Sequence, residues 1–537
     1  MTLTVFIAIA ALVIFLCVLL NDASSKLGMP MLLAFILLGM VFGVDGVFKI
    51  KYDDFPVTED ICTIALIFII FYGGFGTRWK EARKVFGPAA LLSTLGVFIT
   101  AGLTGLFCHF VLKMDALFSF LVGAVLSSTD AASVFSILRS RKLGLKYGTA
   151  SMLEVESGSN DPMSYMLTIV MVSIIGGDIS GGRIAYMIFA QFVYGAAIGL
   201  AVGVLAAKVM TKFKASSAGF DSLFVVAIAL FSYSIPGLVG GNGYLSAYIA
   251  GIILGNADIR GKKSLVPFFD GINGMMQVLI FFLLGLLSTP SKLPEVALIA
   301  VAVSMFMIVV ARPLAIFSVL PFFKCKFRQQ LLVSFVGLRG AASVVFAIMA
   351  TPAVTRITDD SSMLFNIVLM VVLISIALQG SLIPWVSGKS GMIDKDEDIM
   401  KTFTDYSDET EVCFVQMEIT EKDQWNGKVV KDLPIPNDTI VAVVIRNGEA
   451  IVPSGKTRII AGDKVIMSAI EFDDQNVIHL SERKIEKDNE WIGKRVFQYS
   501  PGTDELIVLI RRGDKVIIPR GGTVICEGDV MVLNKIR

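Results

Sequence analysis

Apolar stretches that are long enough to cross a lipid bilayer recur along most of this chain. Each has a core of roughly 17 to 25 residues, the length that a helix needs to span the hydrocarbon layer. They begin near residues 3, 30, 61, 86, 115, 149, 183, 220, 242, 263, 293, 327 and 360. The repetition predicts an α-helical polytopic membrane domain with thirteen transmembrane helices.

The composition supports a membrane protein and excludes several other classes. The 537 residues are 55% hydrophobic and 17% charged, with a mean hydropathy of +0.73, beyond the range of ordinary soluble domains. A formal net charge of +1 gives no basis for binding a nucleic acid polymer. The six cysteines form no CxxC pair and have no neighbouring histidine, so neither a disulfide framework nor a zinc site is predicted. We expect no enzyme activity and no cofactor.

Basic residues gather in alternate loops, which predicts the orientation of the chain. By the positive-inside rule these loops are cytoplasmic, so the N-terminus lies outside and, with an odd number of spans, the C-terminal tail lies in the cytoplasm. The protein is thus expected to be multi-pass in the cell membrane. The basic loop residues are Arg78, Lys80, Arg83 and Lys84; Arg139, Arg141, Lys142 and Lys146; Lys208, Lys212 and Lys214; Arg260, Lys262 and Lys263; and Lys324, Lys326 and Arg328.

A change in composition after Trp385 marks a domain boundary. We expect a transmembrane domain over 1–388 and a polar, acidic linker over 389–410, followed by a small α/β tail of two similar units, 411–475 and 476–537. The duplication is visible where Ile445-Arg446-Asn447-Gly448 is repeated as Ile510-Arg511-Arg512-Gly513. Asn447-Gly448 between apolar runs predicts a two-residue hairpin turn.

A fainter repeat lies within the membrane domain. Thr129-Asp130-Ala131-Ala132-Ser133-Val134 in the fifth span resembles Arg339-Gly340-Ala341-Ala342-Ser343-Val344 in the twelfth. Seven spans separate the two, so they run in opposite directions. Both place polar groups inside an apolar helix, as the discontinuous helices of inverted-repeat transporters do.

Four ionisable residues lie at membrane depth: Asp130, Glu156, Asp161 and Arg339. A carboxylate at the centre of a membrane helix costs about 2.5 to 3.5 kcal/mol, so each is a candidate for function, the alternative being a structural ion pair. Arg339 can neutralise one of the three acids. The others need a helix end, a proton or a bound cation, and this imbalance favours cation transport.

The sixth span carries two adjacent polar stripes. Glu156 and Asn160 share one helical face, and Ser157 and Asp161 share the next. The first stripe can hold Arg339, and the second offers a carboxylate and a hydroxyl oxygen to an alkali cation. In the fifth span, Asp130 follows a predicted unwound segment, where it is either a helix cap or a direct ligand.

Together, several of these motifs resemble the monovalent cation/proton antiporter superfamily, in its NhaP-like branch. The resemblance covers residues 1 to about 388. The residues that carry it are the run Glu156-Ser157-Gly158-Ser159-Asn160-Asp161, the earlier Ser128-Thr129-Asp130, and the later Gly337-Leu338-Arg339-Gly340 and Leu378-Gln379-Gly380.

The resemblance implies a thirteen-span inverted-repeat homodimer in which Asp161 binds the ion, assisted by Ser157 and by the backbone at Thr129. It further implies a supporting polar group made of Glu156, Asn160 and Arg339. One departure concerns selectivity. Some sodium-selective relatives have an acid in the third span, where this chain has Tyr72-Gly73-Gly74-Phe75.

The duplicated tail resembles the C-terminal domain of regulators of potassium conductance. Similar tails bind small regulatory ligands such as cyclic dinucleotides or nucleotides, and a purely dimerising role is the alternative. No GxGxxG motif follows a predicted strand, so the sequence does not support a dinucleotide site. The association with potassium systems favours potassium as the transported cation.

The sequence therefore predicts an antiporter that exchanges K⁺, or alternatively Na⁺, for H⁺ in a 1:1 electroneutral cycle, with membrane lipid around it and a regulatory tail. A tail-gated cation channel and a membrane sensor are the competing classes. A channel needs a symmetric filter of carbonyl groups, and no filter-like repeat is present. A sensor has no need for Asp130, Glu156 and Asp161 to be buried together.

Overall fold

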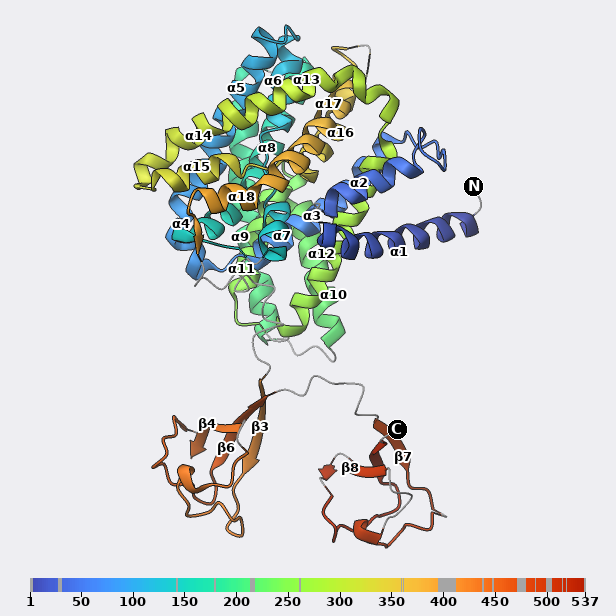
Figure 1. The fold of residues 1–537 in the computed structure, drawn as a ribbon, viewed down its shortest axis with the longest axis vertical. Helices are drawn as coiled ribbons and strands as arrows, with labels where there is room; N and C mark the ends of the chain where they lie inside the picture. Colours follow the sequence, from blue (N-terminus) through green and yellow to red (C-terminus); the bar gives the residue numbers. More distant parts are fainter. Residues whose placement is uncertain are drawn as a thin grey trace. The chain divides into compact units, whose positions relative to one another are not determined.

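The computed structural model divides into two compact units, Met1–Ser407 and Asp408–Arg537 (Figure 1). The described residues are 3–27, 31–141, 143–177, 180–212, 218–259, 262–358, 360, 362–394, 412–436, 439–446, 449–470, 480–487, 489–498, 505–513, 515–517 and 519–535. The predicted linker beyond residue 394 and the predicted Asn447-Gly448 turn lie outside them.

The first unit consists of helices that pack against one another (Figure 1). Several of them, including α3, α6 and α11, begin after a capping residue. The side chains of Asp54, Asp115 and Asn242 accept a hydrogen bond from the backbone N–H three residues later, at 3.0–3.1 Å. The helices are α1 (Leu3–Leu27), α2 (Met31–Phe42), α3 (Phe55–Gly76), α4 (Trp79–Leu91), α5 (Val97–Phe110), α6 (Ala116–Val125), α7 (Ala131–Ser140), α8 (Thr149–Ile175), α9 (Gly181–Lys212), α10 (Ala218–Gly237), α11 (Gly243–Asn256), α12 (Lys262–Leu287), α13 (Leu293–Phe306), α14 (Arg312–Val319), α15 (Phe327–Phe335), α16 (Ala341–Val354), α17 (Met363–Ile374) and α18 (Ser381–Lys389).

Among the described residues, seven helical runs are long and apolar enough to cross a membrane by length and composition. They are Phe55–Gly76, Trp79–Phe110, Gly181–Lys212, Gly219–Gly237, Ser264–Leu287, Pro290–Phe323 and Met363–Lys389. Shorter apolar helices include Ala116–Val125 and Ala341–Val354. A fold rich in apolar helices is as predicted, and the number of thirteen spans stays a prediction.

Two helical runs are interrupted in the middle of apolar sequence. Residues 126–130 separate α6 from α7, and residues 336–340 separate α15 from α16. The two breaks touch: the Asp130 N–H donates to the Leu338 carbonyl at 2.8 Å. Ser127, Ser128 and Arg339 at the breaks are buried. Backbone groups that lose their helical hydrogen bonds at the two breaks thus come together in the interior of the protein.

Glycine allows α3 and α11 to approach closely. A Cβ at Gly251 would overlap the Phe71 carbonyl, and one at Gly255 would overlap the Phe75 carbonyl. The two glycines are four residues apart and lie on one face of α11, the small-residue spacing that permits close contact between membrane helices. This contact holds α3 and α11 together as neighbours.

The chain after the last helix returns to the loop before α8. Strand β1 (Gly144–Leu145) pairs antiparallel with β2 (Ile393–Asp394). The Lys146 N–H also donates to the Met392 carbonyl at 2.9 Å, and Met392 is buried. The segment that leads to the tail is thereby bonded to the loop that leads into α8.

The second unit contains two four-stranded antiparallel sheets with the same strand order. In each sheet the first strand pairs with the fourth, the fourth with the second, and the second with the third. Among the described tail residues the remaining regular structure is single 3₁₀ turns, whereas an α/β tail was predicted. The strands are β3 (Val412–Glu418), β4 (Thr439–Arg446), β5 (Glu449–Ile451) and β6 (Lys464–Ile470), then β7 (Leu480–Lys484), β8 (Glu505–Arg512), β9 (Lys515–Ile517) and β10 (Val530–Lys535).

Each sheet contains an equivalent arginine–aspartate pair. Arg446 Nε donates to Asp463 Oδ1 at 2.8 Å, and Arg512 Nε donates to Asp529 Oδ1 at 2.7 Å. Both carboxylates are fully buried, and each arginine also bonds a backbone carbonyl of its own sheet. The hydrogen bonds from Arg446 hold the pKa of Asp463 below its usual value of 3.8.

We predict that Asp463→Asn loosens the first sheet and leaves the second sheet unchanged. The asparagine amide has one acceptor oxygen and no charge, so it cannot replace the two charge-assisted hydrogen bonds that Asp463 accepts from Arg446. About 1–3 kcal/mol of local stability should be lost. Hydrogen exchange of β6 amides in the full-length protein measures this, and β10 is the internal control.

The pH dependence of the same measurement has a defined sign. A carboxyl whose pKa is lower in the folded state than in the unfolded state adds stability above its unfolded pKa and loses it as the pH falls. Protection of β6 should therefore decrease as the pH falls from about 5 in the unmodified protein. The protection of β6 should depend less on pH in Asp463→Asn. An equal decrease in the variant and in the unmodified protein would contradict a stabilising role of the Arg446–Asp463 pair.

Candidate functional site

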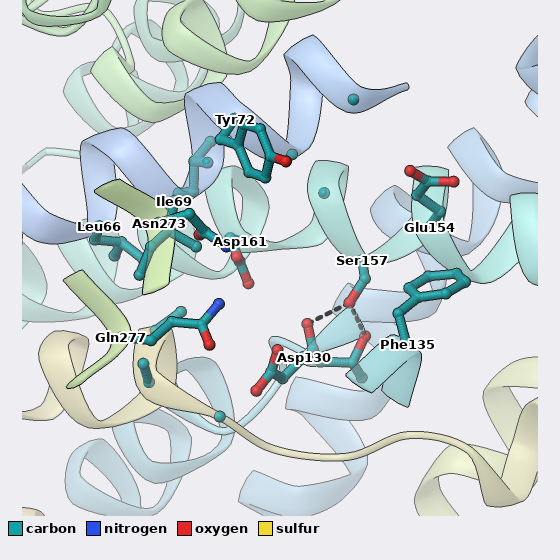
Figure 2. Close-up of a pocket in the computed structure, with 18 of the residues that line it drawn as sticks. Leu66, Ile69, Tyr72, Asp130, Phe135, Glu154, Ser157, Asp161, Asn273 and Gln277 are labelled. Carbon is teal, nitrogen blue, oxygen red and sulfur yellow. Dashed lines mark hydrogen bonds between the residues drawn. The ribbon is translucent and has the colours of Figure 1, made fainter. Parts of the chain in front are cut away.

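A cavity of about 440 Å³ lies within the first unit. One wall is formed by α8, by the break between α6 and α7, and by the start of α16; the other is formed by α2, α3 and α12 (Figure 2). The polar residues that line it are Tyr72, Ser128, Thr129, Asp130, Glu154, Ser157, Asp161, Asp270, Asn273 and Gln277. The cavity brings together all four residues predicted to bind the cation and proton: Asp161, Ser157, Thr129 and Asp130.

Thr129 joins the break to α8 through a dense set of hydrogen bonds. Its N–H donates to Asn160 Oδ1 at 3.3 Å, and its hydroxyl oxygen accepts from Asn160 Nδ2 at 2.5 Å. The Ser157 hydroxyl donates to the Thr129 carbonyl at 2.5 Å (Figure 2). All three residues are buried. Asn160 therefore holds the unwound backbone of the break against α8.

Asp161 lies one residue further along α8 and is partly exposed toward the cavity. Ser128 donates a hydrogen bond from its hydroxyl to Asp161 Oδ1. The hydroxyl in contact with the carboxylate thus belongs to Ser128, which was not in the predicted set, and not to Ser157. Pro162 follows within the continuous helix, and its carbonyl accepts from Asn242 Nδ2 at 2.8 Å.

Asp130 caps α7 and also lines the cavity. Its Oδ1 accepts from the Ser133 N–H at 3.2 Å, and its Oδ2 accepts from the Ser133 hydroxyl. A Cβ at Gly340 would overlap the Asp130 carboxylate, so the absence of a side chain at Gly340 allows the two breaks to meet. Of the two predicted roles the cap is observed, and a direct ligand role stays a prediction.

Arg339 binds the backbone of the opposite break. Its Nη1 donates to the carbonyls of Ser127 and Ser128 at 3.0 and 2.7 Å. Its own N–H donates to Ser375 Oγ, and Ser375 in turn donates to Gln379 Oε1 at 2.6 Å. The Leu378-Gln379-Gly380 motif therefore contributes to the site through its glutamine, which also donates to the Phe335 carbonyl at the end of α15.

The predicted pairing of Glu156 with Arg339 was wrong. Glu156 is paired with Arg312, which donates from Nη1 and Nη2 to the two carboxylate oxygens at 2.5 and 2.9 Å. The side chain of Glu156 is 1% exposed and that of Arg312 is 5% exposed, so this is a buried, bidentate ion pair. Because Arg312 occupies both oxygens of Glu156, Arg339 is left to bind carbonyl groups.

Sequence reasoning missed Arg312 and the polar side chains of α3 and α12. Arg312 interrupts a long apolar run, and the same depth argument that selected Arg339 selects it as well. Asp270 lines the cavity beside α3, whose own cavity-lining residues include no acid, and Tyr72 donates its hydroxyl proton to Asp270 Oδ1 at 3.2 Å. Among the described residues, no group of three or more His, Cys, Asp or Glu side chains could hold a resident metal.

Comparison with known proteins identifies the first unit. The family model described as "Sodium/hydrogen exchanger, transmembrane" matches residues 11–389, which is more than half of the chain. The chain belongs to this family. The resemblance inferred from the motifs is thereby confirmed, and so is a multi-pass membrane protein.

Relatives within the family match much of the chain. It is 35% identical over 464 residues to a protein of Shewanella sp. (strain MR-4) named K(+)/H(+) antiporter NhaP2, covering 85% of this chain and 80% of that one. A protein of Alkalimonas amylolytica named K(+)/H(+) antiporter NhaP is 37% identical over 358 residues, covering 66% and 62%.

A solved structure and a second family model complete the comparison. The structure of the sodium proton antiporter MjNhaP1 from Methanocaldococcus jannaschii at pH 8 matches with a TM-score of 0.62 and 25% identity, covering 71% of this chain and all of that one. A TrkA-C domain model matches residues 414–470, the first tail sheet. The predicted regulator-type tail is confirmed for that sheet.

We predict that breaking the buried pair destabilises the membrane unit. Glu156→Leu or Arg312→Met alone leaves one charge buried without its partner, which costs about 3 to 5 kcal/mol. The double variant removes both charges and should regain much of the melting temperature. Thermal unfolding of the detergent-solubilised protein measures this, and a double variant as unstable as the two losses summed would contradict the pairing.

Proposed function

We propose that this chain exchanges one potassium ion for one proton across the membrane, with Asp161 as the group that both ions share. The observation that carries the proposal is the placement of Asp161. Its carboxylate lies against an unwound helix, is bonded by Ser128 on one oxygen, and borders a cavity of about 440 Å³. Oxygen ligands for an alkali cation are therefore available around the Asp161 carboxylate.

The charges at the helix breaks support an electroneutral cycle. Among the described residues, the deep ionisable ones form a set of five, Asp130, Glu156, Asp161, Arg312 and Arg339, while Glu154 and Asp270 line the cavity outside this set. Within the set, Glu156 and Asp130 supply two negative charges, and Arg312 and Arg339 supply two positive charges. Asp161 is the fifth ionisable group. Either a proton or a monovalent cation neutralises it, so exchanging one for the other leaves the net charge of the region unchanged. This balance favours a 1:1 stoichiometry.

The relatives favour potassium over sodium. The proteins from Shewanella and Alkalimonas are named for potassium, at 35% and 37% identity. The Methanocaldococcus structure is named for sodium, at 25% identity. The alternative is a sodium/proton antiporter with the same site, and separate assays with each cation distinguish the two.

We further propose the assembly and topology that the motifs imply. The protein is a homodimer with thirteen spans, counting α6 with α7 and α15 with α16 as one crossing each and as the discontinuous halves of an inverted repeat. The N-terminus lies outside and the tail lies in the cytoplasm. In the site, Ser157, Thr129 and Asp130 complete the ion-binding set around Asp161, and Asn160 and Arg339 support it.

For the tail we propose two similar regulatory units, 411–475 and 476–537, joined to the membrane domain 1–388 by the linker 389–410. The identical strand order and the equivalent ion pairs support two copies of one unit. A small ligand such as a cyclic dinucleotide or a nucleotide is the proposed signal. The bond between β1 and β2 gives the linker a direct connection to the loop before α8.

We predict that Asp161→Asn abolishes exchange and leaves the fold intact. An amide fills the same space but neither releases a proton nor balances a cation. Purified protein in liposomes, assayed for potassium-driven proton movement, should show wild-type rates for Asp258→Asn on an exposed loop and none for Asp161→Asn. Proton-coupled flux surviving in Asp161→Asn, or a wild-type rate driven by membrane potential alone, would rule out the mechanism.

We predict that the tail regulates exchange without performing it. A chain ending at residue 400 keeps β2 and should still exchange, with an altered response to pH or ligand. A chain ending at residue 390 also loses the β1–β2 pairing and the buried Met392, so it should melt at a lower temperature. If the folded 400-residue form shows no exchange at any pH, this division of roles is wrong.

A further inference from the structure

Helix α12 presents a polar stripe to the cavity. Asp270, Asn273, Gly274 and Gln277 all line it, at the spacing i, i+3, i+4 and i+7 that places residues on one helical face. On the opposite wall lie Asp161 and the break between α6 and α7 (Figure 2). The cation site as described so far uses only that opposite wall.

Gln277 is the most deeply buried residue of this stripe. Its side chain is buried, with 8% of the residue exposed, and it points into the cavity (Figure 2). Its amide makes no hydrogen bond to any residue that the structure describes, and the same holds for Asn273. The amide is not enclosed by the protein but faces the cavity, so its oxygen is available to coordinate a cation and its N–H groups are available to that cation's water.

Asp270 lies closer to the end of the helix. It is eight residues past the start of α12, about 12 Å along the axis, and Gln277 is about 10 Å deeper. Asp270 is exposed, and the Tyr72 hydroxyl orients its carboxylate. An exposed carboxylate at the mouth of a low-dielectric cavity raises the local concentration of cations.

We propose that α12 forms the second half of the cation site. The Gln277 side-chain oxygen is a direct ligand of the transported cation and faces Asp161 across the cavity, while Asp270 attracts the cation to the mouth. Neutral amide oxygens suit this role, because they coordinate an alkali cation without adding a charge that would hold it permanently. The proposal rests on the cation exchange proposed above and assigns part of its specificity to α12.

The test compares Gln277→Met with Gln277→Asn in the full-length protein in liposomes. Methionine keeps the length and approximate volume of the side chain but has no amide oxygen. We expect the potassium concentration for half-maximal exchange to rise about tenfold in Gln277→Met, with the maximal rate within about twofold of wild type, because one ligand is lost. Gln277→Asn should recover part of the affinity.

A binding measurement separates this proposal from the exchange mechanism itself. Potassium should raise the melting temperature of the detergent-solubilised wild-type protein, because a ligand that binds only the folded state stabilises it. The shift should shrink in Gln277→Met, which should melt near wild type without potassium. An unchanged shift and an unchanged half-maximal concentration in Gln277→Met would overturn the ligand role, whether or not exchange is observed.

Asp270→Asn tests the second half of the proposal. It should raise the half-maximal potassium concentration at low ionic strength, and the difference should fade at high salt because the attraction is screened. Asp258→Asn removes the same charge from an exposed loop outside the cavity lining and should have no such effect. Equal behaviour of the two variants would show that Asp270 does not act at the cavity mouth.

Discussion

Backbone groups left unpaired at a helix break are expensive in a medium that contains no water, and this unit has two such breaks. Each is satisfied partly by the other and partly by side chains of neighbouring helices. Arg339 donates to two carbonyls of the opposite break, and the Asp130 N–H donates to the Leu338 carbonyl. Gln379 donates to the carbonyl of Phe335, the last residue of α15. The contact between the two breaks also positions Asp161, because Ser128, which bonds its carboxylate, lies in the first break.

The acids of the region have separate tasks because their surroundings differ. Both oxygens of Glu156 are occupied by Arg312, so this carboxylate cannot also bind a transported ion. Asp130 uses its oxygens on the first turn of α7. Asp161 alone of the three has its carboxylate bonded by a single neutral hydroxyl at the edge of the cavity. This difference is why we propose Asp161 as the group that a proton and a cation share.

How much of this could be read from the sequence depends on the kind of pattern. The cost of burying a charge and the i, i+4 spacing in α8 were enough to select Asp161, Ser157, Asn160 and Glu156. The partner of Glu156 was not predictable in this way, because one deep arginine begins α14 and another lies in the break before α16, and only the packing of α14 against the core decides between them. The stripe on α12 has a visible spacing, yet a polar stripe does not reveal which wall it faces. In the tail, alternation predicted strands, while the order of strands depends on long-range pairing.

Each sheet of the tail is formed within one repeat, whereas in the membrane unit segments far apart in the sequence bond each other at the two breaks. Every described strand of a sheet pairs within its own repeat, and each repeat carries its own arginine–aspartate pair. Because neither repeat contributes a described strand to the other's sheet, surface substitutions in one repeat do not disrupt the sheet of the other. The family model matches only residues 414–470, which is what divergence of the second copy would produce. Because each sheet is complete in itself, selection can alter the surface of one copy while the other copy keeps its structure.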